Sequence, residues 1–272
     1  MLYFVFTVDG DWSQYYDPAL SEEKRRPSLQ KLVDYVKEEI KVTEALKGKF
    51  VHFIHTSPRA RDFFLRREFV TLFRQIMDFQ GSLGIHCHED DPRKEYFYAD
   101  QKRMREVIGF FCEALSENRL KASAYRGGYL AFSPLTIPVL EENHIFLDFS
   151  CEPGRYLMHG SNLVSDWRGA PDNFYRLDYQ DHRRRGSSNV FEIPVGIYVE
   201  NLSLAKIQSK AKKLKEKAEN SNIIVSVLTH SFNFGNFFER RKIVKALKIL
   251  KQYGTFINAE EAHSKIVEEE KR

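Results

Sequence analysis

Short apolar runs alternate along this chain with longer segments in which apolar residues recur every three or four positions. The first run, residues 2–8, is almost wholly apolar, aromatic or β-branched, as is typical of a strand buried on both faces of a parallel sheet. In residues 29–40 the apolar positions recur at helical spacing, and Ser28 precedes them as an N-cap candidate. The same reasoning predicts further strands at 50–56, 82–87, 122–126, 145–150, 191–195, 222–228 and 255–258. Further helices are predicted at 57–80, 100–117, 133–142, after Ser203 and at 238–252, with a helical or frayed tail from Ala259.

This order of elements predicts an α/β fold. Strands that alternate with helices form βαβ units, whose strands are parallel. Seven or eight such units follow one another without a break of domain size, so we expect a single domain over residues 1–272 in the form of a (β/α) barrel. No Gly-x-Gly-x-x-Gly turn follows the first strand, which argues against a dinucleotide-binding fold.

One long segment interrupts the alternation. Residues 151–189 are irregular and rich in Gly, Pro, Asp and Arg. Connections of this length are usually functional or disordered. We therefore expect a loop insertion that shapes the specificity of the barrel's site.

The charge pattern is that of a globular protein without a nucleic-acid partner. Hydrophobic residues make up 42% of the chain, charged residues 29%, and the net charge is +4. The positive surplus lies mainly in residues 183–185, 206–217 and 240–242. Apolar residues recur at helical spacing within 206–217, so its lysines are expected to form a solvated helix face. No nucleic-acid-binding motif accompanies these basic residues.

The cysteine count and the N-terminal region predict a cytoplasmic protein. Cys87, Cys112 and Cys151 are an odd number and have no metal-finger spacing, so no disulfide framework is implied. Residues 2–8 read as a strand of the fold and not as a cleavable leader. No run reaches the ~18 apolar residues of a membrane span.

Two carboxylates follow the first strand. Asp9 and Asp11 are two positions apart, so on an extended chain both could face one pocket. Two close anions need a cation or a shared proton when they are buried. The alternative is a simple turn, because Asp-Gly-Asp is favourable turn chemistry.

A histidine pair ends the third predicted strand. His86 and His88 are also two positions apart, and two imidazoles with one carboxylate are a typical ligand set for a catalytic divalent metal. Exposed loop histidines are the alternative. Asp90 is a spare oxygen ligand or, alternatively, a loop or helix-capping residue.

Other titratable residues also follow strands, where α/β barrels carry their chemistry. They are His55, Arg126, Asp148, Glu192 and His230. His52 has the opposite parity to His55 on its strand and is expected to be structural. We expect Asp148 and Glu192 to support the barrel rim through hydrogen bonds.

Several motifs along the chain resemble those of the polysaccharide deacetylases, carbohydrate esterase family four, which fold as a distorted (β/α)7–8 barrel. Residues 7–11 (Thr-Val-Asp-Gly-Asp) are similar to the family's first motif, Thr-Phe-Asp-Asp, and residues 84–88 lie where the family has its metal-binding histidine pair. Residues 125–129 resemble the third motif, and residues 228–230 match the last motif, Leu-x-His. Segments 166–171 and 192–195 look like those of the branch that acts in surface-polysaccharide biosynthesis.

The resemblance implies a metal-dependent deacetylase acting on an N-acetylated sugar. Asp9 would be the catalytic base, Arg126 its partner and His230 the general acid. Asp11, His86 and His88 would bind a divalent metal, most simply Zn²⁺, and Leu228 would line a pocket for the acetyl methyl group. Trp12, Tyr129 and Trp167 could stack on sugar rings, or could equally be core or rim aromatics. The expected partner is a small-molecule or lipid-linked saccharide substrate, and the oligomeric state is not visible.

The sequence departs from the family pattern at two places. Gly10 stands where the second Asp belongs, so Asp11 would act as ligand one residue later, and the two histidines have one intervening residue instead of three or four. These departures leave three alternatives open. The chain could be another amidohydrolase, such as one like an allantoinase, a glycosidase using Asp9 with Glu192, or a catalytically decayed carbohydrate-binding relative.

Overall fold

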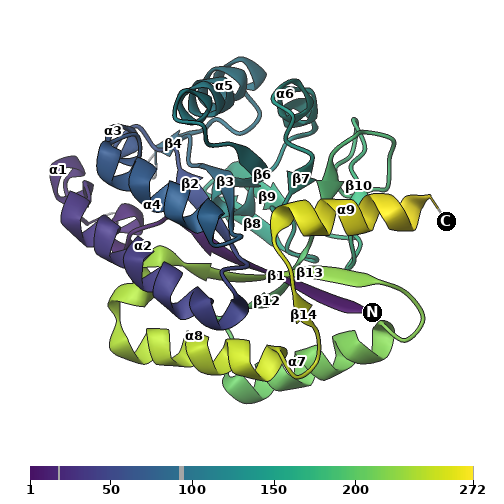
Figure 1. Ribbon diagram of the computed structural model, residues 1–272. Coiled ribbons are helices and arrows are strands. Elements are labelled where there is room, and N and C mark those ends of the chain that lie inside the picture. The colour runs from purple at the N-terminus through teal and green to yellow at the C-terminus, as the bar shows by residue number, and fades with distance from the viewer. Residues whose placement is uncertain (18, 92–94, 272) are drawn as a thin grey trace.

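A curled sheet lies at the centre of the molecule, and helices cover its outer face (Figure 1). The computed structural model describes residues 1–17, 19–91 and 95–271. Within these residues the main sheet has ten strands, nine of them in the order β10-β11-β7-β6-β3-β2-β1-β13-β12, and the tenth, β14, pairs with β1. The strands are β1 (Leu2–Asp9), β2 (Val51–His55), β3 (Ser82–Cys87), β6 (Ala122–Gly127), β7 (Leu147–Asp148), β10 (Tyr175–Arg176), β11 (Phe191–Glu192), β12 (Val195–Tyr198), β13 (Ile223–His230) and β14 (Thr255–Phe256).

The strand pairing confirms the predicted α/β fold with a distorted barrel. The pairs of the main sheet are parallel, except that β10 is antiparallel to β11. β11 pairs with β7, whereas β12, two residues later in the chain, pairs with β13. The Val195 N–H donates to the Cys151 carbonyl at 2.7 Å, and the Ser226 N–H donates to the Pro194 carbonyl at 2.8 Å. The segment 191–198 therefore joins the two sides of the curled sheet.

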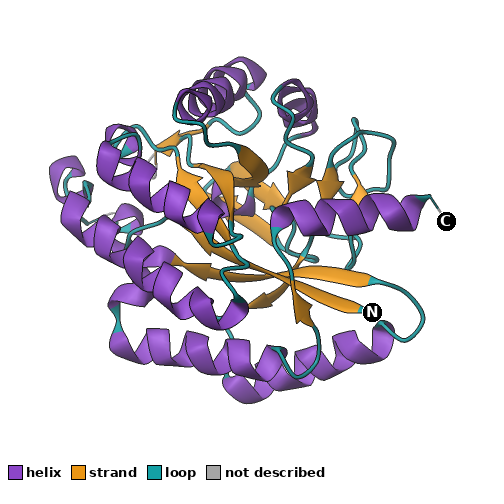
Figure 2. Ribbon diagram, in the orientation of Figure 1, coloured by secondary structure: helices purple, strands orange, loops and turns teal. Residues whose placement is uncertain are grey.

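Helices surround this sheet on the outside (Figure 2). The larger ones begin close to the predicted positions, and Ser203 accepts the Lys206 N–H as the predicted N-cap of α7. The helix bounds are α1 (Glu22–Arg25), α2 (Leu29–Thr43), α3 (Arg61–Phe64), α4 (Arg67–Asp78), α5 (Gln101–Glu117), α6 (Ile137–Glu142), α7 (Leu204–Lys217), α8 (Phe237–Leu250) and α9 (Ala259–Glu270). None of the helices in the described residues is both long and apolar enough to cross a membrane.

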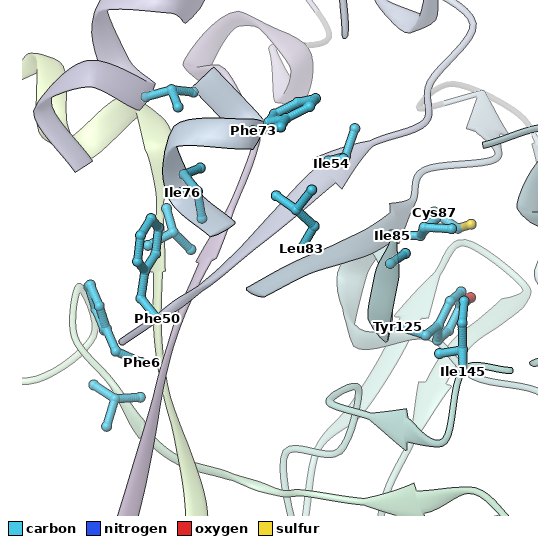
Figure 3. Packing of buried hydrophobic residues seen from close by; sticks show 14 of the residues in the cluster. Phe6, Phe50, Ile54, Phe73, Ile76, Leu83, Ile85, Cys87, Tyr125 and Ile145 are labelled. Carbon is cyan, nitrogen blue, oxygen red and sulfur yellow. The ribbon is translucent and has the colours of Figure 1, made fainter. Parts of the chain in front are cut away.

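Side chains of β1 alternate between two buried environments. Phe4, Phe6 and Val8 belong to the large apolar cluster between the sheet and its helices, part of which is shown in Figure 3. Tyr3 and Val5 belong to a second cluster inside the sheet's curve, which α9 covers with Ala259, Ala262 and Ile266. This alternation places Thr7 and Asp9 on the inner face, above the apolar filling.

Three predicted segments differ from the structure. The expected helix at 57–80 is two helices, α3 and α4, separated by two residues. The expected strand at 191–195 is divided into β11 and β12, and β12 continues to Tyr198. The loop at 151–189 contains a hairpin of β8 (Tyr156–His159) and β9 (Asn162–Asp166), besides β10. Its strands have mostly exposed side chains, so the apolar alternation that reveals a half-buried strand is weak there.

Candidate metal centre and active site

Asp9 and Arg126 form a buried ion pair inside the barrel, at the carboxyl ends of strands β1 and β6. Arg126 Nη1 donates to Asp9 Oδ1 at 2.6 Å, its Nη2 donates to Thr7 Oγ1 at 3.1 Å, and its Nε donates to the Phe149 carbonyl at 2.8 Å. The guanidinium also lies over the Phe53 ring, 4.6 Å from its centroid. Each end of the guanidinium is thus held, and its charge compensates the buried carboxylate of Asp9.

Asp11, His86 and His88 converge beside this pair. The three offer ligand atoms that lie within 4.8 Å of one another, and all three residues are buried. His86 Nε2 is 3.4 Å and His88 Nε2 is 3.8 Å from Asp11 Oδ1. Burial alone would raise the pKa of Asp11, but the neighbouring His86 and His88 hold it well below its usual value. The carboxylate is therefore ionised at neutral pH.

The donor set fits a divalent metal ion. His86 Nδ1 donates to the Arg126 carbonyl at 3.2 Å, so its Nε2 carries the lone pair that faces Asp11. Among the described residues this buried Nε2 has no hydrogen-bond partner. One carboxylate and two imidazoles are ligands that suit Zn²⁺ and related ions. The side chain of Asp90, the spare ligand, lies outside the described part of the structure.

His55 is a third imidazole at this cluster. Its Nε2 is 3.2 Å from Asp11 Oδ1, and its ring stacks on His88 with 4.5 Å between centroids. Its Nδ1 accepts the Ser57 N–H at 3.1 Å. Burial and the neighbouring His88 lower the pKa of His55 well below its usual value, so the ring is neutral and its proton is on Nε2. His52, as expected from parity, points to the helices and contacts Glu39.

His230 faces the same carboxylates from β13. It is held by Glu200, a residue that the sequence did not single out. His230 Nε2 is 3.5 Å from Asp11 Oδ2, and its Nδ1 donates to Glu200 Oε1 at 3.0 Å. Burial would lower the pKa of His230, but the hydrogen bond and charge of Glu200, with Asp11 and Asp9, raise it to about 9. Glu200 was missed because the strand was predicted to end at Val195, although apolar residues still alternate through Val199.

These groups border a cavity of about 280 Å³. Asp9, His86 and His230 line it on one side, and Leu228 and Tyr129 are among its other walls. The structure therefore brings the expected Leu228 and Tyr129 to the same space as the charged groups. Four further residues line it that the sequence did not single out, namely Leu130, Arg155, Tyr198 and Phe232.

Trp12 and Trp167 do not reach this cavity. They are 1% and 0% exposed, and each indole N–H is already donated, by Trp12 to the Arg25 carbonyl and by Trp167 to the Leu130 carbonyl. Trp12 packs on Tyr15 and His55, and Trp167 packs on Phe132 and His182. In this structure neither ring has a face that a sugar could contact. Both indoles pack in the interior and do not stack on substrate.

Asp148 and Glu192 lie on the other face of the sheet. Glu192 alternates with Phe191 and Ile193, which pack in the inner cluster, so it points away from the Asp9 side. Asp148 accepts the Ser150 hydroxyl at 2.6 Å, and Glu192 accepts the Cys151 N–H at 3.0 Å. The two therefore make the expected supporting hydrogen bonds, and a glycosidase pair of Asp9 with Glu192 is contradicted by their orientation.

Comparisons with known proteins place the fold. No protein-family model matches the sequence, and no curated protein matches it significantly. A Mycobacterium smegmatis protein described as a polysaccharide deacetylase matches with a TM-score of 0.64 at 14% identity, over 99% of this chain and 91% of that one. The allantoinase Puue matches at 0.61 and 12% identity, over 94% and 86%. A mutant of a Bacillus anthracis CE4 family pseudoenzyme, with restored enzymatic activity, matches at 0.52 and 9% identity, over 96% and 66%.

At these identities the likeness concerns the fold and not the activity. The three matches comprise two different described activities and one pseudoenzyme, and one fold can carry unrelated chemistries. The function has to be argued from the side chains around the cavity. Over nearly its whole length, this chain has the fold of the polysaccharide deacetylase structures.

Proposed function

We propose that the protein is a metal-dependent hydrolase that removes the acetyl group from an N-acetylated sugar or saccharide precursor. The observation that carries this proposal is the position of Asp9 and His230. Both line one cavity, and both lie beside the Asp11–His86–His88 cluster. A base, an acid and a set of metal ligands thus surround one space.

Asp11, His86 and His88 would hold the ion, which when bound polarises an amide carbonyl and makes water a better nucleophile. Asp9 accepts the proton of the attacking water. Arg126 engages Asp9 Oδ1, which leaves Oδ2, 3.8 Å from His86 Nε2, for this task. His230 carries a proton at neutral pH because of Glu200, and it gives that proton to the leaving amine. Leu228 offers an apolar contact for the acetyl methyl group.

The test combines metal analysis with acetate release from an N-acetylglucosamine oligosaccharide. We expect one zinc ion per chain in the wild-type protein. Asp9→Asn should keep its metal and lose about 10²- to 10⁴-fold in turnover, the usual contribution of a general base. His86→Ala should lose the metal. His159→Ala, on the exposed hairpin, serves as the matched histidine control and should change neither quantity.

Two outcomes would contradict the proposal. Wild-type turnover in Asp9→Asn would remove the assigned base. Stoichiometric zinc without any acetate release from the wild-type protein would favour the catalytically decayed relative, and hydrolytic ring opening of allantoin to allantoate instead would favour the allantoinase alternative.

A further inference from the structure

A second cavity adjoins the first. It has a volume of about 330 Å³ and lies between β12 and α7, and Tyr198 lines both cavities. Three lysines of α7 border it, Lys210, Lys213 and Lys217. Their spacing places them on one face of the helix. The lysines that were expected to form only a solvated face are therefore divided, and one group lines a cavity that shares Tyr198 with the candidate active site.

The cavity has positive charge in excess of its own carboxylates. Lys217 is paired with Asp172, and the other acidic residue of the wall, Glu152, is paired with Arg155 at 2.9 Å. In the described part of the chain no carboxylate forms an ion pair with Lys210 or Lys213. The amine of Lys210 lies 3.4 Å from the Gly196 carbonyl. Two ammonium groups thus remain available to an anion that enters the cavity.

Arg155 stands at the boundary of the two cavities. It lines the first cavity, while its partner Glu152 lines the second. Its Nε is buried, and among the described residues it has no hydrogen-bond partner. A buried donor without an acceptor is costly, and a water molecule or a ligand oxygen at that point would satisfy it. Arginine is well suited to phosphate oxygens.

We propose that the second cavity binds a pyrophosphate group linked to the sugar, with Arg155 at the sugar-proximal phosphate and Lys210 and Lys213 at the distal one. This inference rests on the proposed function, because it assumes that the sugar occupies the first cavity. Either cavity alone is near or below the lower end of the ~300–1,000 Å³ that is usual for ligand sites, whereas the two together suit a larger activated saccharide. The apolar side chains of Val195, Leu202 and Leu214 complete the wall beyond the lysines.

The test measures inorganic pyrophosphate binding by calorimetry, on full-length protein freed of divalent ions so that no metal mediates the contact. The variant is Lys210→Gln with Lys213→Gln, and the matched control is Lys212→Gln with Lys215→Gln on the same helix, outside the cavity. Gln keeps the helix propensity of Lys, so both proteins should fold. We expect at least tenfold weaker binding in the first variant and unchanged binding in the control. Equal binding in both, or no binding to the wild-type protein, would overturn the inference.

Two further experiments complete the test. The first distinguishes a nucleotide-linked pyrophosphate from a lipid-linked one, and the second distinguishes failure of this inference from failure of the proposed function. UDP that binds more tightly than pyrophosphate would identify a nucleotide sugar, whereas farnesyl diphosphate that does so would identify a lipid-linked one. Asp9→Asn should bind pyrophosphate as the wild type does. If acetate release depends on Asp9 but the lysine variant binds pyrophosphate normally, only this inference fails. If pyrophosphate binding depends on the lysines but no acetate is released, only the proposed reaction fails.

Discussion

The hydrogen bond on the remote nitrogen of each ring decides what His55 and His86 can do. A carbonyl faces Nδ1 of His86, so the proton lies on Nδ1 and the lone pair of Nε2 faces Asp11. A backbone N–H faces Nδ1 of His55, so the neutral ring has the opposite tautomer and its Nε2–H faces Asp11. His86 is therefore built to bind a metal, and His55 to orient the carboxylate that binds it.

This difference predicts the behaviour of a His55 variant. His55→Ala should weaken zinc affinity about 10- to 100-fold without abolishing binding, the usual effect of removing a group that orients a ligand. His55→Gln, which keeps a donor, should recover part of the loss. Competition for zinc with a chromogenic chelator measures both. Complete loss of zinc in both variants would show that His55 is itself a ligand, and unchanged affinity would show that Asp11 needs no such support.

Glu200 gives the second residue-scale prediction. His230 must be protonated to act as the acid, so activity should fall as the pH rises through its pKa, which the Glu200 hydrogen bond helps to raise to about 9. In Glu200→Gln the adjacent charge is lost, and the alkaline limb of kcat/KM should move to lower pH by about 1–3 pH units. The pH–rate profile measures this shift. A lower rate at every pH with an unmoved limb would mean that Glu200 only supports the fold.

At the scale of elements, a buried pair joins three parts of the chain. Glu39 of α2 accepts His52 Nδ1 of β2 at 2.7 Å and the Ser231 hydroxyl at 2.5 Å, where the turn after β13 begins. Glu39 and His52 are 0% exposed. Two hydrogen bonds to one shared carboxylate thus fix the helix against β2 and against the turn after β13, and β2 and β13 are the strands that flank β1.

Removal of this carboxylate should be costly. Glu39→Ala leaves His52 and Ser231 buried without their acceptor, and breaking such a pair from one side costs about 3–5 kcal/mol. Glu38→Ala, its neighbour in the sequence, removes partly exposed ion pairs with Lys41 and Arg240 and should cost about 0–1 kcal/mol. Urea denaturation of both variants compares the two free energies of unfolding. Equal losses would contradict the structural role of Glu39.

The elements also show why the sequence revealed part of the site and not the rest. Each apolar run ends at a polar residue, and alternation fixes the face that Asp9, His55 and His86 share. Glu200 was missed because it lies two residues beyond β12, whose strand was predicted to end at Val195, and Arg155 was missed because it precedes a hairpin with exposed side chains. Trp12 and Trp167 were assigned to sugar binding because residue type alone does not tell a packed ring from an accessible one.

At the scale of the whole molecule, two buried acidic residues lie on the outer face of the sheet, on the opposite side from the cavity. Asp148 and Glu192 are adjacent in register on β7 and β11 and fully buried. Burial and their mutual repulsion raise the pKa of Glu192 well above its usual value, and burial raises that of Asp148. In the folded state they therefore keep protons that the unfolded chain releases.

The sign of this linkage gives a stability prediction. Because Asp148 and Glu192 bind more protons in the folded protein than in the unfolded chain above a pH of about 4, the contribution of this pair to the free energy of unfolding should fall as the pH rises from there. Glu192→Gln cannot ionise, so its stability should fall less between pH 5 and pH 8. Guanidinium denaturation at several pH values measures the slope, with Glu216→Gln on α7 as control. Parallel pH profiles for Glu192→Gln and the wild type would contradict the prediction.

The apolar filling beneath Asp9 has a consequence for how a substrate moves. Val5, Phe53 and Ile224 occupy the barrel interior below the ion pair, and α9 covers that end with Ala262 and Ile266. A glycan strand therefore cannot pass through the barrel, and acetate must leave by the same opening through which the sugar entered. Any polymer would therefore have to present its sugar residues to Asp9 from outside, one at a time.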